Sequence, residues 1–395
     1  MNIIIIINSV IILDKLDMSQ IDTWHFPRTE QANMLITALE SGITNHLTLF
    51  APRRMGKTEF LLQDLMPIAQ KKNYIIIYIN LWSEQEDPGL VIVQKLYEAI
   101  LELNNRKHSL IKMLEPELKK IYMKGTLPFL GEIGTEVEFK KKKDPDAIGT
   151  INLNLLIDKL LQVLVDLAKN RTPLILLDEV QHLASHKKFL PLTAALRTAL
   201  DTRKVKVKVI FTGSSRQGLL RMFNDSKAPF FNMSVNVPFP TLDIKFVEFI
   251  LKKYYQITKK KLDLKLALQF FEKLHFNPFY FRNLIMKCLF HSMNLNDAYP
   301  LIESEISEEN NFQGIWSRLD TLEQMVFMEI IANRNLYSVE TLKTFSELIG
   351  EKITTQKVQT SLNRLIKLNL IGLEGRASYF CENDLFSDWV KINKL

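Results

Sequence analysis

The fold is decided by one stretch, His46–Met66, which reads HLTLFAPRRMGKTEFLLQDLM. It begins with five residues typical of a buried strand and ends with the start of an amphipathic helix, expected over 59–70. Between them, Ala51–Thr58 follows the pattern G-x-x-x-x-G-K-[ST], with alanine in place of the first glycine. A loop between a strand and a helix N-terminus turns several backbone N–H groups toward one point, which suits phosphate oxygens. The stretch therefore predicts a phosphate-binding loop at the carboxyl end of a β-strand.

The residues of this loop have separate expected tasks. Gly56 lets the backbone approach a phosphate closely, and Lys57 neutralises the β- and γ-phosphates during catalysis. The Thr58 hydroxyl is a ligand for Mg²⁺. Ala51 serves in place of glycine if its backbone lies in a region open to L-residues. The expected nucleotide-binding residues of the loop are Ala51, Pro52, Arg53, Arg54, Met55, Gly56, Lys57, Thr58 and Glu59.

A second motif, Leu174–Glu179, reads LILLDE and places two acids at the end of an apolar strand. Ligands bind at the carboxyl ends of parallel strands, so these acids are expected beside the phosphate-binding loop. Asp178 holds Mg²⁺ in this interpretation, and Glu179 polarises the attacking water as a general base. Without the loop upstream this would be an acidic turn, but the two motifs together predict binding and hydrolysis of ATP or GTP.

Further apolar segments alternate with helical ones. Helices are expected over 24–40 and 90–103, and strands are expected over 46–50, 74–80, 173–178, 205–212 and 233–237. Strands that alternate with helices predict an α/β fold with a doubly wound parallel sheet. The fourth strand ends in VIFTGSSR, so Thr212, Ser214 or Ser215 is expected to position water or sense the γ-phosphate. The alternative for Ser214 and Ser215 is N-capping of the following helix.

The chain divides into several expected parts. They are a dispensable stretch over 1–17, an ATPase core over 18–240 with an insertion at about 104–150, a helical lid over 241–310 and a C-terminal domain over 311–395. The stretch Asn2–Leu13 is apolar but shorter than the roughly 20 residues that span a bilayer. The aromatic-rich segment after Pro240 is expected to form core. Three helices (319–332, 338–348 and 354–368) and two short strands predict a winged helix.

These blocks resemble the AAA+ ATPases and, more narrowly, the STAND-like group of archaeal-type ATPases. The resemblance rests on Pro52–Thr58 (PRRMGKT), Leu176–Leu183 (LLDEVQHL), Thr212–Ser215 (TGSS) and the tail Gly372–Val390. It covers most of residues 20–395 and implies an AAA+-like ATP-binding core, an all-helical lid and a winged-helix end. It also implies that Ser214 lies in the sensor-1 region and that Arg282, in the sensor-2 region, reaches the γ-phosphate.

The chain departs from that group at two positions. Before Arg282, the segment 275–278 lacks the glycine that the group often has. Asn232 stands where the group has an arginine that is a candidate finger, a residue worth about 10³–10⁵ in rate. Arg216 and Arg221 are the candidates to replace it. We therefore expect hydrolysis to be slow or stimulated by a partner.

Charge bears on the choice of partner. The chain carries 51 basic and 44 acidic residues, a formal net charge of +7. Residues 311–395 contain ten of each, so the whole excess lies in residues 1–310. The third helix of the C-terminal domain nevertheless has a polar face suited to phosphate and base contacts, formed by Gln356, Lys357, Gln359, Thr360, Asn363, Arg364 and Lys367.

The sequence thus predicts a cytoplasmic, ATP- and Mg²⁺-dependent switch that binds no membrane. Its nucleotide state is expected to control self-association and engagement of a macromolecular partner through the lid and winged helix. One alternative is a DNA-binding regulator or a replication or transposition accessory ATPase. Another is a signalling or defence ATPase that acts on a protein, and a third is a non-catalytic nucleotide-binding scaffold. The two cysteines, Cys288 and Cys381, exclude a cysteine-based zinc site.

Overall fold

The computed structural model describes residues 22–103, 152–374 and 378–394. The stretch over 1–17, which is expected to be dispensable, and nearly all of the insertion expected at 104–150 lie outside the described residues. The chain forms two compact units. The first contains residues up to 51, 57–214 and 218–239, and the second contains 52–56, 215–217 and 240–395. The four-part division expected from the sequence stays a prediction.

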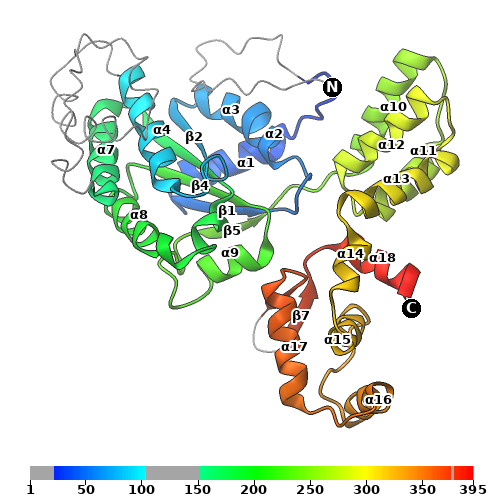
Figure 1. Cartoon of the computed structure of the whole chain (residues 1–395). Helices are drawn as coiled ribbons and strands as arrows, with labels where there is room; N and C mark the ends of the chain where they lie inside the picture. The colour runs from blue at the N-terminus through cyan, green and yellow to red at the C-terminus, as the bar shows by residue number, and fades with distance from the viewer. Residues whose placement is uncertain (1–21, 104–151, 375–377, 395) are drawn as a thin grey trace, which may run out of the picture. The chain divides into compact units, whose positions relative to one another are not determined.

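The first unit is built on a five-stranded parallel sheet in the order β2-β3-β4-β1-β5 (Figure 1). Its strands are β1 (His46–Phe50), β2 (Tyr74–Asn80), β3 (Thr172–Asp178), β4 (Lys208–Gly213) and β5 (Val235–Pro238). The predicted α/β parallel sheet is confirmed. The predicted start of β4 at Val205 is wrong, because residues 203–206 form a turn after a helix and Val205 is exposed. The fifth strand starts two residues later than predicted, at Val235.

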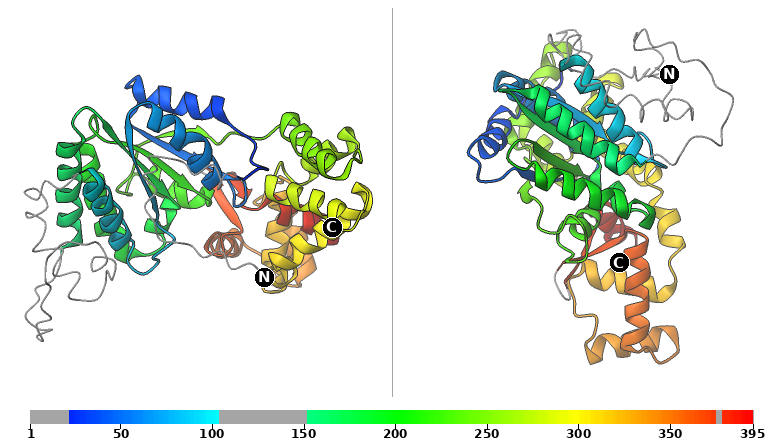
Figure 2. Two further views of the ribbon diagram at one scale, coloured as in Figure 1. Left: turned by 90° about the horizontal axis from the view of Figure 1, so that it is seen from above. Right: turned by 90° about the vertical axis from the view of Figure 1, so that its left-hand side faces the viewer.

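Helices cover both faces of this sheet (Figure 2). One face packs against α4 (Pro88–Leu103), α7 (Leu153–Ala168) and α8 (Leu190–Thr202). Alternate strand residues supply that core, because side chains of a strand point to opposite faces in turn. They are Ile75, Ile77, Ile79, Ile175, Leu177, Val209 and Phe211. The other face carries α1 (Thr29–Glu40) and α3 (Met66–Lys71).

Two helix boundaries differ from the prediction. The helix expected from Trp24 starts at Thr29, because Pro27 disfavours helical backbone at the residue before it. The helix after the phosphate-binding loop consists of α2 (Lys57–Glu59), a π-helical segment (Phe60–Leu65) and α3. A π-helix leaves little trace in apolar spacing, so the sequence indicates one continuous helix there.

The first unit also contains two short 3₁₀ segments and one more helix. The 3₁₀ segments are Val180–Ala184 and Lys187–Phe189, and the helix is α9 (Arg216–Phe223). The start of α9, residues 216–217, belongs to the second unit.

The second unit begins with four helices: α10 (Ile244–Thr258), α11 (Leu264–Lys273), α12 (Pro278–Phe290) and α13 (Leu295–Glu309). Phe246, Phe271 and Phe281 pack together with ring centroids 5.0–5.9 Å apart and are almost fully buried. The aromatic stripe after Pro240 is therefore core, as predicted. The side chains of Asp243, Asp263, Asn277 and Asn294 cap the four helices.

The rest of this unit has the helix–helix–helix–hairpin order predicted from the sequence. It comprises α14 (Phe312–Ser317), α15 (Thr321–Ile331), α16 (Val339–Ile349), α17 (Thr355–Lys367), β6 (Ile371–Glu374), β7 (Ser378–Cys381) and α18 (Asp384–Lys394). The strands β6 and β7 pair antiparallel. None of the described helices combines the length and apolarity needed to cross a membrane.

Candidate nucleotide site

Strand order assembles the candidate site in the first unit. β1 pairs with β4, and β4 pairs with β3, all in parallel. Phe50 lies beside Gly213 in this register, so the residues that follow β1, β3 and β4 reach the same edge of the sheet. Ala51, the residues Lys57 and Thr58 that end the loop, Asp178–Glu179 and Ser214 are therefore neighbours at that edge, although the sequence separates them widely.

The backbone explains why alanine replaces the first glycine of the loop. Arg54 and Gly56 have φ of 67° and 78°, whereas Ala51 lies outside the positive-φ region. A methyl group therefore adds no backbone strain at Ala51, and the residue is buried. Its N–H donates to the carbonyl of Gly213 at 3.4 Å. The backbone of Ala51 thus lies in a region open to L-residues, which is the condition under which alanine can replace glycine here.

Lys57 is 6% exposed, and its Nζ donates to the carbonyl of Ala51 at 2.7 Å. A buried ammonium needs compensating partners, and a carbonyl supplies only a partial negative charge. Phosphate oxygens at the same point would supply a full one. The position thus fits the phosphate-neutralising role expected of Lys57.

Asp178 is the centre of the site and is 1% exposed. Its Oδ2 accepts hydrogen bonds from Thr58 Oγ1 at 3.2 Å and Tyr78 OH at 2.9 Å. Its Oδ1 accepts from the hydroxyl of Thr212 and from the backbone N–H of Glu179 at 3.0 Å. The structure brings together Thr58 and Asp178, the two expected magnesium ligands. A hydroxyl beside a carboxylate is an oxygen donor set suited to Mg²⁺.

Glu179 directly follows and adopts a left-handed backbone, with φ 57° and ψ 40°. Its Oε2 accepts hydrogen bonds from Ser214 Oγ at 2.7 Å and from the side-chain amide of Gln181. An αL conformation costs free energy for a residue with a Cβ, and at functional sites the surroundings hold it in place. Ser214 therefore contacts the expected general base, whereas Thr212 contacts Asp178.

Sequence reasoning missed Tyr78 and Gln181. Tyr78 lies within the apolar run YIIIYIN, where an aromatic residue is indistinguishable from core. The available signal was its place two residues before the carboxyl end of β2. Gln181 lies two residues after Glu179 in a 3₁₀ segment, and a polar residue so close to a candidate base was a usable signal.

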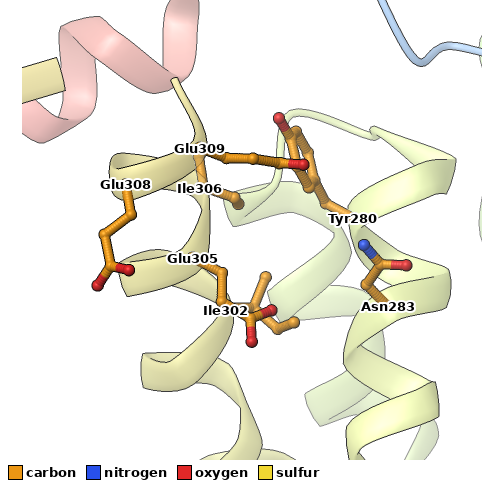
Figure 3. A pocket seen from close by; sticks show the side chains of 7 residues that line it. All are labelled: Tyr280, Asn283, Ile302, Glu305, Ile306, Glu308 and Glu309. Atoms are coloured by element: carbon orange, nitrogen blue, oxygen red, sulfur yellow. The ribbon is translucent and has the colours of Figure 1, made fainter. Parts of the chain in front are cut away.

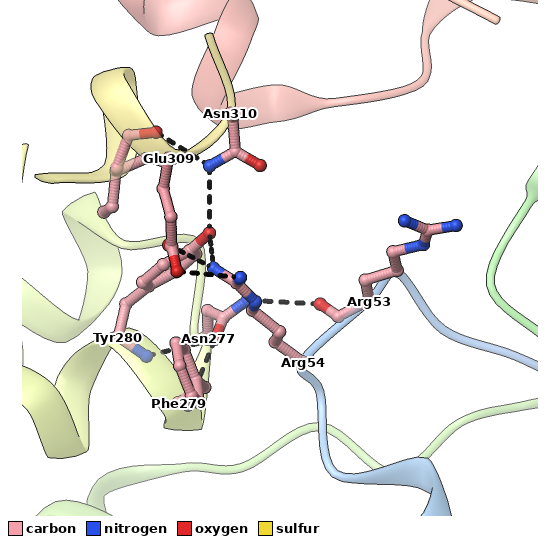
Figure 4. A network of polar contacts seen from close by, with 8 residues as sticks. Arg53, Arg54, Asn277, Phe279, Tyr280, Glu309 and Asn310 are labelled. Carbon is pink, nitrogen blue, oxygen red and sulfur yellow. Dashed lines mark hydrogen bonds and ion pairs between the residues drawn. The ribbon is translucent and has the colours of Figure 1, made fainter. Parts of the chain in front are cut away.

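In the second unit, the guanidinium of Arg54 is held by residues of α12 and α13 (Figure 4). Nη1 donates to Tyr280 OH and to Glu309 Oε2, each at 2.6 Å, and Nη2 donates to Glu309 Oε1 at 3.0 Å. The ring of Phe279 lies 4.6 Å from the guanidinium carbon. The bonds to Glu309 are the main reason that the pKa of Arg54 is raised above its ordinary value. The side chain of Arg54 thus contacts a carboxylate, while the sequence predicted nucleotide contact.

In the second unit, Arg216 and Gln217 contact the C-terminal hairpin, which consists of β6, β7 and Glu382 directly after β7. The N–H of Gln217 donates to Glu382 Oε1 at 2.8 Å, and the N–H of Leu373 donates to Gln217 Oε1 at 2.9 Å. The guanidinium of Arg216 lies 4.3 Å from the ring centroid of Phe380. The role of Arg216 as a replacement arginine finger stays a prediction.

The other predicted arginine positions are dispersed. Arg282 is half-buried on α12, in the second unit. Arg221 is exposed on α9 and lines a cavity of about 250 Å³. Asn232 has φ of 51° and donates its N–H to the carbonyl of Phe223 at 3.0 Å. The roles proposed for Arg282 and Arg221 stay predictions.

A cavity of about 440 Å³ lies between α12 and α13 (Figure 3). It is lined by Tyr280, Asn283, Ile302, Glu305, Ile306, Glu308 and Glu309. Three carboxylates at one cavity repel a polyphosphate, so this cavity does not suit a nucleotide. The residues expected to bind phosphate lie instead at the carboxyl edge of the parallel sheet.

Comparisons with known proteins support the fold. No protein-family model and no curated protein matches the sequence. Among solved structures, a Walker-type ATPase of Pyrococcus abyssi is similar, with a TM-score of 0.59 and 17% identity over 93% of this chain and 96% of that one. The Aeropyrum pernix ORC2 protein in its ADP form has a TM-score of 0.49 and 12% identity, covering 92% of each chain. The chain thus shares the fold of the Walker-type ATPase, and at 17% identity the likeness extends to the fold alone.

Proposed function

We propose that this protein binds ATP with Mg²⁺ and hydrolyses it, as a switch whose nucleotide state controls self-association and engagement of a macromolecular partner. The observation that supports this proposal most directly is the 3.2 Å distance between Thr58 Oγ1 and Asp178 Oδ2. Glu179 is the next residue along the chain. A phosphate-binding lysine, a hydroxyl, a buried carboxylate and a second carboxylate at one sheet edge are the groups that phosphoryl transfer to water requires.

Each residue has a distinct task in this mechanism. Lys57 and the backbone N–H groups of the loop bind the β- and γ-phosphates, and Thr58 and Asp178 hold Mg²⁺, which neutralises phosphate charge when bound. Glu179 orients the attacking water and accepts its proton. Ser214 and Gln181 both donate to Oε2 of Glu179, which leaves Oε1 of the carboxylate to accept a proton from the attacking water.

The switch is supported by the two short segments that belong to the second unit. Residues 52–56 lead by a peptide bond into Lys57, and residues 215–217 follow Ser214. Arg54 is bound by Glu309 and Tyr280, and Gln217 is bound by the C-terminal hairpin. A nucleotide that draws Arg54 toward its phosphates would have to break the bonds to Glu309. Nucleotide affinity would then differ between the two arrangements, which is what a switch needs.

The partner in this proposal is a protein or a second copy of the chain, and the place of action is the cytoplasm. DNA is the alternative, and the exposed polar face of α17 favours it. Arg364 weakens that alternative, since its guanidinium lies 3.1 Å from the buried carboxylate of Glu323. Lys357 is likewise 2.9 Å from Glu351. In this proposal the C-terminal domain is a winged helix.

The experiment is size analysis of the full chain with and without MgATP and duplex DNA, using the unaltered protein and Glu179→Gln. We expect MgATP to change the size or the protease pattern, and Glu179→Gln to prolong the change. An identical size and cleavage pattern in every condition would contradict the switch. A larger species formed only with DNA would favour the alternative.

A further inference from the structure

Both strands that flank β3 in the described sheet supply a hydroxyl donor to Asp178, Thr212 from β4 and Tyr78 from β2. Thr58, Thr212 and Glu179 are all part of the motifs that define the site, whereas Tyr78 belongs to none of them. Its hydroxyl lies 2.9 Å from Asp178 Oδ2. An interior residue of a buried strand that contacts the central carboxylate needs a separate explanation.

The register of the sheet explains how Tyr78 reaches this carboxylate. β2 and β3 pair in parallel, with Tyr78 opposite Leu176 and Asn80 opposite Asp178. Residues two apart on a strand share a face, so Tyr78 and Asp178 are diagonal neighbours on one face of the sheet. A short side chain at position 78 would not span the diagonal. A phenylalanine would span it but would offer no proton.

The phenol of Tyr78 is a hydrogen-bond donor to a charged group. An ordinary tyrosine keeps its hydroxyl proton through the neutral range. The bond to Asp178 Oδ2 is therefore one between a neutral donor and an anionic acceptor. Such bonds are stronger than those between neutral groups.

The contact restrains the carboxylate oxygen that also faces Thr58. Asp178 Oδ2 accepts hydrogen bonds from both Thr58 and Tyr78. Thr58 has a single hydroxyl proton, and while that proton points at Asp178 the oxygen lone pairs remain available to a cation. Thr58 lies on α2, which directly follows the loop, whereas Tyr78 lies within β2, the neighbour of β3 in the sheet. The bond from Tyr78 therefore ties the Asp178 carboxylate to the sheet itself.

We propose that Tyr78 is a positioning residue for magnesium, which acts by fixing the carboxylate of Asp178. The inference rests on the proposed nucleotide-binding function and assigns to this tyrosine a role that none of the site motifs requires. Partners behind a metal ligand orient it, and their loss typically costs 10- to 100-fold in metal affinity or activity.

The test is a magnesium titration of ATP binding to the full chain, with a fluorescent ATP analogue as the probe. We compare the unaltered protein, Tyr78→Phe and Tyr74→Phe. Tyr74 is the matched control because it lies on the same strand and face, is buried, and is at the opposite end of β2 from the site. Binding in EDTA and the unfolding temperature without nucleotide are measured for all three.

We expect Tyr78→Phe to raise the Mg²⁺ concentration for half-maximal binding about tenfold. Its affinity in EDTA and its unfolding temperature should stay close to those of the unaltered protein, and Tyr74→Phe should resemble the unaltered protein throughout. An unchanged Mg²⁺ requirement in Tyr78→Phe overturns the inference and leaves the proposed function intact. An equal loss of affinity with and without Mg²⁺, or an equal shift in Tyr74→Phe, indicates a packing effect and also overturns it. Failure of the unaltered protein to bind ATP overturns both.

Discussion

Thr58 Oγ1 lies 3.2 Å from Asp178 Oδ2, although 120 positions separate the two residues in the chain. This contact joins the phosphate-binding loop to the acidic end of β3. Local folding alone does not bring the two residues together. The contact depends on the placement of β1 and β3 on either side of β4. It places the expected phosphate-binding and magnesium-binding residues in one site.

Lys57→Ala should lower the affinity for ATP by at least about 30-fold. Truncating one partner of a buried charge pair costs about 2 kcal/mol or more, which corresponds to at least about a 30-fold loss of affinity. Titration calorimetry with MgATP measures the change. Lys71→Ala is the matched control, since Lys71 is an exposed lysine of α3. Equal affinity in the two variants would contradict the assignment of Lys57.

Glu179→Gln should keep MgATP binding and lose hydrolysis by about 10²-fold or more, because an amide cannot accept the proton of water. The amide keeps the volume of the side chain and can still bond to Ser214. Phosphate release measures hydrolysis, and nucleotide binding is measured on the same preparation. Hydrolysis at the unaltered rate would contradict the assignment of Glu179 as the general base.

Gln181→Leu should raise basal hydrolysis about fivefold, since it removes one of two side-chain donors to Glu179, a bond worth about 1 kcal/mol. In the described part of the chain, the Oε1 atom of Gln181 is buried and has no hydrogen-bond partner. Leucine therefore removes an unsatisfied polar atom, and we expect the free energy of unfolding to be preserved. A slower rate would show that Gln181 assists Glu179.

Glu309→Gln should raise ATP affinity about two- to fivefold by releasing Arg54, since partly exposed ion pairs contribute about 1 kcal/mol or less. Glu308→Gln is the matched control, because Glu308 lines the same cavity and accepts a bond from Ser304. The gain should shrink at high salt, which weakens the pair in the unaltered protein. Lower affinity in Glu309→Gln alone would mean that the pair holds the loop ready for nucleotide.

Lys367→Glu should leave duplex DNA affinity unchanged at low salt, because the C-terminal domain has equal numbers of basic and acidic residues. Arg364→Glu is a poor test, since it would place a second carboxylate beside Glu323. Fluorescence anisotropy with a labelled duplex measures the affinity. Salt-dependent binding that Lys367→Glu abolishes would establish α17 as a DNA-binding surface.

Much of the site could be predicted because its chemistry lies in contiguous motifs. Ala51–Thr58 and Leu174–Glu179 each contain the residue types that their task requires, and both lie at the ends of apolar strands. The partners of Asp178 and Glu179 could be predicted only in part. Tyr78 has the appearance of a core residue, and the π-helical turn after Glu59 has no distinct apolar spacing.

The sequence by itself determined the parallel α/β core, the phosphate-binding loop, the acidic strand end and the helix order of the C-terminal part, because each is a local pattern of polarity and turn chemistry. The tertiary structure alone decided which side chains meet: Tyr78 with Asp178, Gln181 and Ser214 with Glu179, and Arg54 with Glu309. These contacts depend on strand order, on register and on a left-handed residue at Glu179. The physical reason is that a hydrogen bond requires two groups within about 3 Å, and linear spacing in the chain does not set that distance for residues on different elements.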